Sequence, residues 1–442
     1  MKLVRMLLAH SKVAFRAPSS VRTVDWIGSG HIQPNAESYE AKHSNVTEMQ
    51  LQSNMVPMSK MRARIIAAFN AALPVAQLGT LYGRAEQLDA LSEAILDHGQ
   101  HAVVYGERGS GKTSLVRVFG LQADKAGAIV IYQSCEKHET FADLIRPYLK
   151  EIPSAALPPG QFTRFREEIA ALGDDFGPRD VVNFLDQISH TDILFVIDEF
   201  DRVTNASIQA DIATFMKLLT DGLSPIRLLI VGIAQLVSEL IEHHKSLRRH
   251  MVALPVGRIS DTSGATLISE GARASGISFS AAAQKSIISL SCGSPYHIRL
   301  FCLHSALEAF RLGLETVDTR ALNNGLRIAY ERWKAFNPKD AGLFNQLTHL
   351  SDSKKIILWQ VAETIARNDG LHFSEPQSTL KDIDVDMALS ALGSAVTPRL
   401  ATTKLIKFDD SLAPQFLLVA FSLNKQKKSH EDTTISNEEC AA

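Results

Sequence analysis

Short apolar runs alternate with amphipathic stretches in the first half of the chain. Four runs have the continuous hydrophobic character of strands buried on both faces: Ala102–Tyr105, Ala128–Tyr132, Ile193–Ile197 and Arg227–Ala234. Helical periodicity separates them, over Thr140–Leu149, Phe162–Leu172, Val181–Ser189 and Ala206–Leu219. Because strands joined by helices run parallel, this alternation predicts an α/β fold whose parallel sheet is covered on both faces.

The second half of the chain has a helical period throughout its first part. From Asp261 to Lys334 the pattern is wholly helical, and four helices are expected, over Thr266–Ala274, Ala281–Leu290, Pro295–Leu312 and Thr319–Trp333. Asn337–Asp340 is expected to be a hinge. Beyond it lie two helical patterns, then a candidate wing and a closing helix, over Lys354–Arg367, Met387–Leu392, Leu405–Phe408 and Gln415–Phe421. This order is the arrangement of a winged-helix domain.

A glycine-rich loop follows the first apolar run directly. Residues Gly106–Thr113 fit G-x-x-x-x-G-K-[ST]. A loop that turns its backbone N–H groups around a phosphate chain needs dihedral angles that glycine adopts most cheaply. Lys112 would place its ammonium against the β- and γ-phosphates, and Thr113 would offer its hydroxyl to Mg²⁺. The predicted phosphate-binding residues are Gly106, Glu107, Arg108, Gly109, Ser110, Gly111, Lys112, Thr113 and Ser114.

A second motif makes a chance match to the first one improbable. Taken alone, the glycine-rich pattern could be an ordinary turn between a strand and a helix. The apolar run Ile193–Ile197 ends in Asp198 and Glu199, which is a hydrophobic strand tipped by an acidic pair. Asp198 is a candidate Mg²⁺ ligand, and Glu199 is a candidate catalytic base that polarises the attacking water. The predicted ligand is a nucleoside triphosphate with magnesium.

These motifs resemble those of a known family. Leu-Tyr-Gly-Arg-x-x-Gln-Leu from Leu81, the glycine-rich loop, and Val-Ile-Asp-Glu-Phe-Asp-Arg from Val196 are similar to the AAA+ and STAND-type P-loop ATPases. The likeness is greatest to the branch that includes replication-origin recognition ATPases and bacterial ATP-binding regulators. It implies ATP as the nucleotide, because in that family the Gly-Arg box packs against adenine. Tyr82, Gly83 and Arg84 would have that role here.

The resemblance implies further catalytic and sensing residues. Gln235, just beyond the fourth apolar run, matches the "sensor 1" place, where a polar side chain contacts the γ-phosphate or positions water. Arg248 and Arg249 are candidates for an arginine donated to a neighbouring subunit, and Arg249 is the one we select. That role would require a homo-oligomer. Arg299 is the candidate for "sensor 2", although Tyr296 occupies one form of that position.

Composition sets the class of protein and its compartment. The chain has 442 residues, 45% hydrophobic and 21% charged, which is typical of a globular protein with two or three domains. Four scattered cysteines, with no C-x-x-C pair, favour a reducing, cytoplasmic compartment. No apolar run approaches the roughly 18 residues needed to cross a bilayer, so no membrane partner is expected.

The predicted organisation has five parts. We expect a disordered N-terminal extension (1–58), a P-loop ATPase core (59–255), a helical lid (256–336), a winged-helix-like domain (337–424) and a disordered tail (425–442). Residues 1–24 contain five Lys/Arg and no Asp or Glu, which also resembles an organelle transit peptide. A start codon assigned too far upstream is the other alternative.

The partner of the C-terminal domain stays open at this stage. Residues 341–424 contain seven Lys/Arg against nine Asp/Glu, a net charge of −2, whereas a surface that neutralises phosphates should be basic. The domain could instead bind a protein or its own ATPase core. Our main hypothesis is a Mg²⁺-dependent ATPase that acts as a nucleotide-controlled switch. The alternative is an ATP-controlled DNA-binding initiator, transposition or defence factor.

Overall fold

The structure is a computed structural model of the chain. It describes the folded part of the sequence with several gaps. The described residues are 60–74, 79–136, 140–173, 175–188, 191–233, 240, 242, 245–368, 370–372, 385–399 and 405–425. The predictions for residues 1–58, for Gln235 and for the tail beyond 425 lie outside them.

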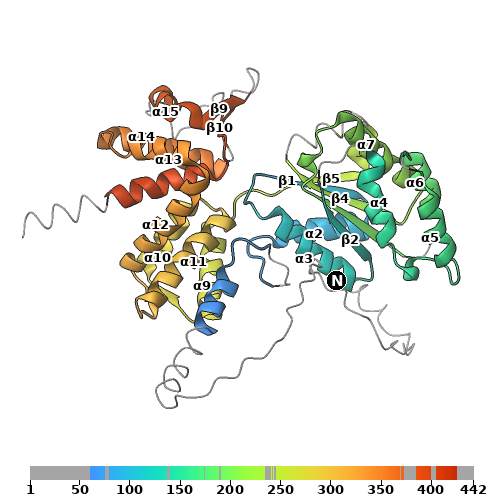
Figure 1. Cartoon of the computed structure of the whole chain (residues 1–442), viewed down its shortest axis with the longest axis horizontal. Helices are drawn as coiled ribbons and strands as arrows, with labels where there is room; N and C mark the ends of the chain where they lie inside the picture. The colour runs from blue at the N-terminus through green and yellow to red at the C-terminus, as the bar shows by residue number, and fades with distance from the viewer. Residues whose placement is uncertain are drawn as a thin grey trace, which may run out of the picture. The chain divides into compact units, whose positions relative to one another are not determined.

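A parallel sheet organises the first half, as predicted (Figure 1). Its strands are β1 (His101–Tyr105), β2 (Ile129–Ser134), β3 (Ile193–Asp198), β4 (Ile226–Gly232) and β5 (Met251–Pro255), in the order β2-β3-β4-β1-β5. Every neighbouring pair is parallel. The edge strand β5 was not predicted, because its apolar run is only four residues long before Pro255, and the structure buries only Met251 of the five residues.

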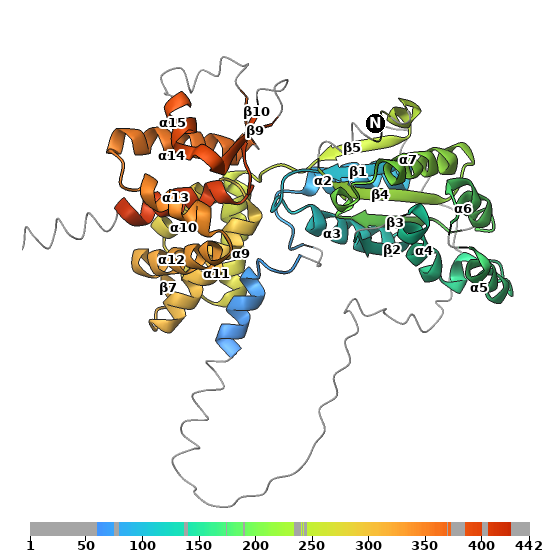
Figure 2. The ribbon, with the colours of Figure 1, turned by 45° about the horizontal axis from the view of Figure 1, so that its top comes forward.

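Alternate side chains of the strands enter two separate cores. Val103, Ile131 and Phe195 pack with α4 (Phe141–Glu151), α5 (Phe162–Ala171), α6 (Pro178–Leu185) and α7 (Ala206–Asp221). Val104, Val196 and Leu229 pack on the other face with α2 (Ala85–Leu91), the π-helix η1 (Ser92–Asp97) and α3 (Lys112–Lys125). Figure 2 shows the sheet between these two layers. Because successive side chains of a strand point to opposite faces, the sheet is covered by α3 on one face and by α4–α7 on the other. The ends of the strands are not covered by these two layers and can form a site.

Four capped helices follow the sheet: α9 (Asp261–Ser275), α10 (Ala281–Ser291), α11 (Pro295–Arg311) and α12 (Thr319–Phe336). Each begins after a residue whose side chain accepts a hydrogen bond from a backbone N–H of the first turn, namely Ser260, Ser280, Ser294 and Asp318. The prediction of a wholly helical segment is wrong. Two short strands, β6 (Ser278–Phe279) and β7 (Thr316–Val317), pair in parallel because the two interhelical loops run side by side.

The segment predicted as a hinge is the start of a helix. α13 (Pro338–Leu347) begins at Pro338, where a missing N–H costs nothing. Trp333 of α12 stacks on Phe344 of α13 and on Phe416, so this junction is packed. The hinge prediction failed because aromatic side chains from distant segments pack at this junction, and a local Asn-Pro signal does not reveal such packing.

The C-terminal part contains helices and a small antiparallel sheet. Its elements are α14 (Asp352–Asn368), β8 (Leu371–His372), α15 (Val385–Leu392), the 3-10 helix η5 (Gly393–Ala395), β9 (Val396–Arg399), β10 (Leu405–Phe408) and a helix over residues 413–425. The strand order is β8-β10-β9. The winged-helix assignment stays a prediction, as do the domain boundaries. One apolar core runs through the helix over residues 60–69, α9–α12 and the C-terminal part.

Candidate nucleotide-binding site

A cavity of about 450 Å³ lies at the carboxyl ends of the central strands. It brings together most of the residues that the sequence singled out, from four distant parts of the chain. The predicted residues that line it are Tyr82, Arg84, Arg108, Gly109, Ser110, Gly111, Lys112, Thr113, Ser114, Asp198, Glu199 and Arg299. Among the predicted residues that the structure describes, Gly83, Gly106, Glu107 and Arg249 do not line it.

The backbone conformation of the loop explains why two of its positions are glycine. A Cβ on Gly106 would lie 2.3 Å from the carbonyl oxygen of Val256, so the backbone of the loop approaches the chain after β5 too closely for any side chain. Gly111 has a φ of 96° and precedes the first residue of α3. Both positions therefore require glycine, and they set the path of the loop into the helix.

Lys112 is the first residue of α3, and its ammonium lies back along the loop. Nζ donates to the carbonyl oxygens of Gly106 (2.7 Å) and Glu107 (3.1 Å). Thr113 and Ser114 follow in the first turn, where backbone N–H groups have no partner within the helix and the helix dipole is positive. Charge and amides together make this end of α3 an anion-binding site.

The acidic pair ends β3 in a sharp turn. Asp198 is 2% exposed, and its Oδ1 accepts a hydrogen bond of 2.8 Å from the backbone N–H of Glu199. The Tyr132 hydroxyl donates to Oδ2 of Asp198. Glu199 has a φ of 55°, which is uncommon for a residue with a side chain and often marks a functional position. The two carboxylates have different partners but line the same cavity.

The Glu199 carboxylate is held by two side chains that the sequence analysis did not identify. Its Oε2 accepts from Ser134 Oγ at 3.2 Å and pairs with Arg202 Nη2 at 2.9 Å. Ser134 ends β2, opposite Asp198 in the register of β2 and β3. The polar residue that ends β2 was visible in the sequence. Linking it to Glu199 required knowing that β2 and β3 are neighbours in the sheet.

Arg84 supports the loop. Its side chain is 4% exposed, and it donates to the carbonyl oxygens of Ser110 and Gly257. Burial, and then the nearby charge of Arg258, lower its pKa to about 10, so it stays protonated at neutral pH. Gly83 has a φ of 68°, and a Cβ there would lie 2.6 Å from Ser263 Oγ. The Gly-Arg box thus joins the loop to the start of α9, while Tyr82 lines the cavity.

The other predicted residues lie in two places, on α11 and at the end of the 3-10 helix before β5. Arg299 and Tyr296 of α11 both line the cavity, and Arg299 donates to the carbonyl oxygen of Ala68 at 3.2 Å. Burial lowers the pKa of Arg299. Arg249 ends the 3-10 helix η4 (Lys245–Arg249), just before β5, and its side chain is exposed. Since β5 pairs in parallel with β1, Arg249 lies at the edge of the sheet opposite the loop, away from the cavity.

The comparisons with known proteins agree with this geometry. Residues 80–231 match the family model described as an AAA ATPase domain. Residues 80–231 are an AAA ATPase domain. The match covers the Gly-Arg box, the loop, the acidic pair and β1–β4. The predicted class of nucleotide-binding domain, a P-loop ATPase of the AAA+ type, is confirmed for this segment of the chain.

Solved structures of low similarity also align with the chain. The ORC2 protein of Aeropyrum pernix, determined with ADPNP and ADP, has 16% identity and a TM-score of 0.45, with 82% of this chain and 98% of that chain covered. Cdc6p of Pyrobaculum aerophilum has 15% identity and a TM-score of 0.46, with 82% and 98% covered. RuvB of Thermotoga maritima has 14% identity and a TM-score of 0.40, with 74% and 90% covered. None of the curated proteins compared with the sequence matches it significantly.

The donor set of the ATPase domain fits Mg²⁺ bound together with nucleotide. No cluster of three or more His, Cys, Asp or Glu side chains that could hold a metal occurs among the described residues. Mg²⁺ in nucleotide sites takes only one or two protein oxygens and completes its shell with phosphates and water. Thr113 and Asp198 supply such oxygens in one cavity. In the part of the chain that the structure covers, no helix has the length and hydropathy of a membrane span.

Proposed function

We propose that the ATPase domain hydrolyses Mg²⁺-ATP and that the bound nucleotide sets the contact between this domain and the C-terminal part. The observation that carries the proposal is the shared cavity, which Lys112, Asp198 and Glu199 all line at the carboxyl ends of the strands. An ammonium, a metal-ligating carboxylate and a second carboxylate are the groups that phosphoryl transfer to water requires.

Each group has a distinct task in this proposal. Lys112 leaves its loop carbonyls and binds the β- and γ-phosphate oxygens, while the amides at the start of α3 hold the β-phosphate. Glu199 accepts a proton from a water whose oxygen attacks the γ-phosphorus. The bond from the γ-phosphorus to the bridging oxygen breaks, and the products are ADP and inorganic phosphate. Mg²⁺, held by Thr113 and Asp198, would neutralise charge that develops on the phosphates.

Two ion pairs connect the C-terminal part to earlier segments of the chain, one at the phosphate loop and one at the start of α9. Lys407 of β10 pairs with Glu107 of the loop, and both side chains are at least three-quarters buried. The Leu412 side chain lies against the loop at Gly109, where an added Cβ would lie 3.1 Å from Leu412 Cδ2. A change in the conformation of the loop on phosphate binding would therefore alter its contacts with Lys407 of β10 and with Leu412.

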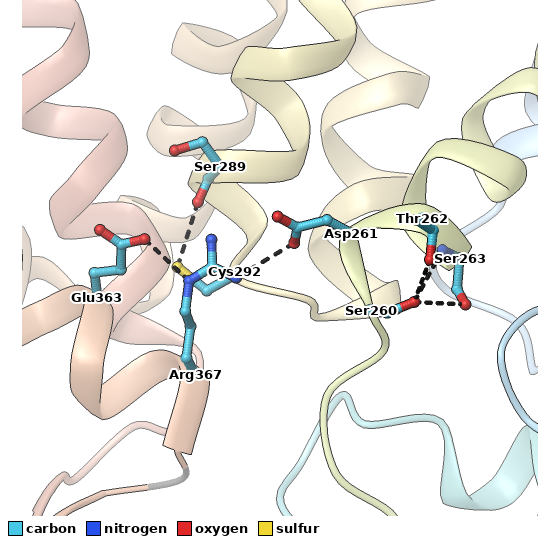
Figure 3. Close-up of polar contacts among 8 residues, drawn as sticks. All are labelled: Ser260, Asp261, Thr262, Ser263, Ser289, Cys292, Glu363 and Arg367. Atoms are coloured by element: carbon cyan, nitrogen blue, oxygen red, sulfur yellow. Dashed lines mark hydrogen bonds and ion pairs between the residues drawn. The ribbon is translucent and has the colours of Figure 1, made fainter.

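The second pair joins α14 to the start of α9. Figure 3 shows Arg367 between Glu363 of its own helix and Asp261, the first residue of α9. Nη1 lies 3.3 Å from Asp261 Oδ1, and Nε lies 3.0 Å from Glu363 Oε1. Two residues beyond Asp261, Ser263 contacts the Gly-Arg box. The C-terminal part thus contacts both the phosphate loop and the start of α9, and this supports a nucleotide-controlled switch.

The test is ATP binding and phosphate release by a Lys112→Ala variant of the full chain. Losing a charged hydrogen-bond donor to phosphate should weaken ATP binding by about 100-fold or more and stop phosphate release. Lys125→Ala, at the exposed far end of α3, is the matched control and should behave like the wild type. Unchanged ATP affinity in Lys112→Ala would contradict the proposal.

DNA binding by the C-terminal part remains the alternative function. Its net charge of −2 over residues 341–424 gives no general attraction to phosphates, so we favour contact with the ATPase domain. A homo-oligomer that uses Arg249 and a cytoplasmic location also stay proposals.

A further inference from the structure

Tyr132 is a partly buried tyrosine whose hydroxyl has a defined partner. It lies on β2, where the register places it opposite Val196 and places Ser134 opposite Asp198. Its ring packs against the α3 face of the sheet. The hydroxyl reaches along the sheet and donates to Oδ2 of Asp198. A phenylalanine could fill the same space, so packing does not explain the hydroxyl.

The Tyr132 ring is fixed from a second side by the helix that carries the phosphate loop. The guanidinium carbon of Arg117, on α3, lies 4.9 Å from the ring centroid, which is a cation–π distance. Three elements therefore meet at one tyrosine: α3, β2 and the acid-tipped β3. Burial, followed by the charge of Asp198, raises the pKa of Tyr132, so its hydroxyl remains a donor at working pH.

The hydrogen bonds of Asp198 determine which way its oxygens face. Oδ1 accepts from the Glu199 backbone N–H, and Oδ2 accepts from Tyr132. A carboxylate with one donor on each oxygen has its plane fixed, and each oxygen keeps a lone pair for another ligand. Groups that fix a metal ligand in this way commonly tune metal affinity.

We propose that Tyr132 is a positioning residue for magnesium, which holds the Asp198 carboxylate in the orientation that Mg²⁺-ATP requires. The proposal rests on the proposed function, because it assigns Asp198 to the metal. Tyr132 touches neither nucleotide nor metal in this scheme, and it acts only through Asp198. The prediction is specific to the metal, so nucleotide binding without Mg²⁺ should not depend on the hydroxyl.

The experiment titrates Mg²⁺ into full-length protein that is saturated with a fluorescent ATP analogue. In Tyr132→Phe the ring and its cation–π contact with Arg117 remain, and the hydroxyl is lost together with its hydrogen bonds to Asp198 and Arg117. We expect the Mg²⁺ concentration at half-saturation to rise about tenfold or more, with unchanged affinity for the analogue in EDTA. Thermal midpoints measured in parallel identify any variant that is merely less stable.

Tyr148→Phe is the matched control. Tyr148 is fully buried, and its hydroxyl donates to β3 at the carbonyl oxygen of Val196 (2.8 Å), but not to Asp198. Its Mg²⁺ titration should match the wild type. In an Asp198→Asn background, Tyr132→Phe should cause no further rise. If the Mg²⁺ titrations of Tyr132→Phe and Tyr148→Phe coincided, the role of Tyr132 would be overturned and the proposed function would stand. If the wild type bound no ATP analogue, the proposed function itself would be overturned.

Discussion

At the scale of single residues, the site depends on a few side chains in unusual settings. Glu199 is the clearest case, since its φ of 55° turns its carboxylate out of the strand direction. Ser134 and Arg202 then hold Oε2. If Glu199 is the general base, its carboxylate must give up part of its pairing with Arg202 when it accepts a proton from water. The turnover rate should therefore be sensitive to Glu199 in a way that nucleotide affinity is not.

The variant Glu199→Gln tests this separation. The amide keeps the size of the side chain but cannot accept the proton, so phosphate release should fall by about 10²- to 10⁴-fold while ATP affinity stays within a few-fold of the wild type. The same substitution at Glu167, which is exposed on α5, is the control and should change neither quantity. If the Glu199→Gln variant released phosphate at the wild-type rate, Glu199 would be excluded as the catalytic base.

At the scale of elements, β1 is joined to its neighbours through a buried histidine. His101 Nδ1 accepts from the Leu228 backbone N–H of β4 at 3.0 Å, and Nε2 lies 2.9 Å from the carbonyl oxygen of Met216 on α7. Burial lowers the pKa of His101 to about 4, from 6.5. Both ring nitrogens are used by the neutral form, so protonation would break the contact with β4.

The stability of the ATPase domain should consequently fall in mild acid. Between pH 6.5 and 4 the unfolded chain binds a proton at His101 that the folded chain does not, so the stabilisation is complete above pH 6.5 and is lost as the pH falls toward 4. The difference amounts to about 3 kcal/mol for His101. Thermal midpoints of wild type and His101→Gln between pH 7 and pH 4.5 should show a weaker pH dependence in the variant. Parallel curves would refute the assignment to His101.

At the scale of the molecule, the C-terminal part contacts the phosphate loop across a sequence separation of 300 residues, between Lys407 and Glu107. The Lys407–Glu107 pair is adjacent to the carbonyl oxygen of Glu107 that accepts from the Lys112 ammonium. This contact therefore stabilises a loop in which Lys112 is bound to carbonyls instead of phosphate. Phosphate binding and C-terminal docking should compete, with a coupling free energy of about 1 kcal/mol.

A charge swap measures this coupling. Lys407→Glu places a like charge beside Glu107, so the C-terminal part should leave the loop and ATP affinity should rise about three- to tenfold. The double variant Lys407→Glu with Glu107→Lys restores an opposite pair and should return the affinity toward the wild-type value. Equal affinities in all three proteins would show that the pair does not couple the two parts.

The sequence by itself determined the local features of this protein. Four strands, the loop from Gly106 to Thr113, the acid pair and the lid helices were predicted, because each is specified by the period or the spacing of neighbouring residues. Errors arose where local signals were weak. The Asn337–Asp340 segment was predicted as a hinge, although α13 begins there, and β5, β6 and β7 were missed because they are short or half-exposed.

The tertiary structure alone decided which residues meet. Strand order and register place Tyr132 and Ser134 beside Asp198 and Glu199, and no spacing along the chain encodes that neighbourhood. The same holds for Arg84, whose guanidinium supports the loop, and for Lys407, which reaches Glu107. Periodicity is a property of adjacent residues, whereas these contacts depend on the free energy of packing the whole sheet, its helices and the C-terminal part together.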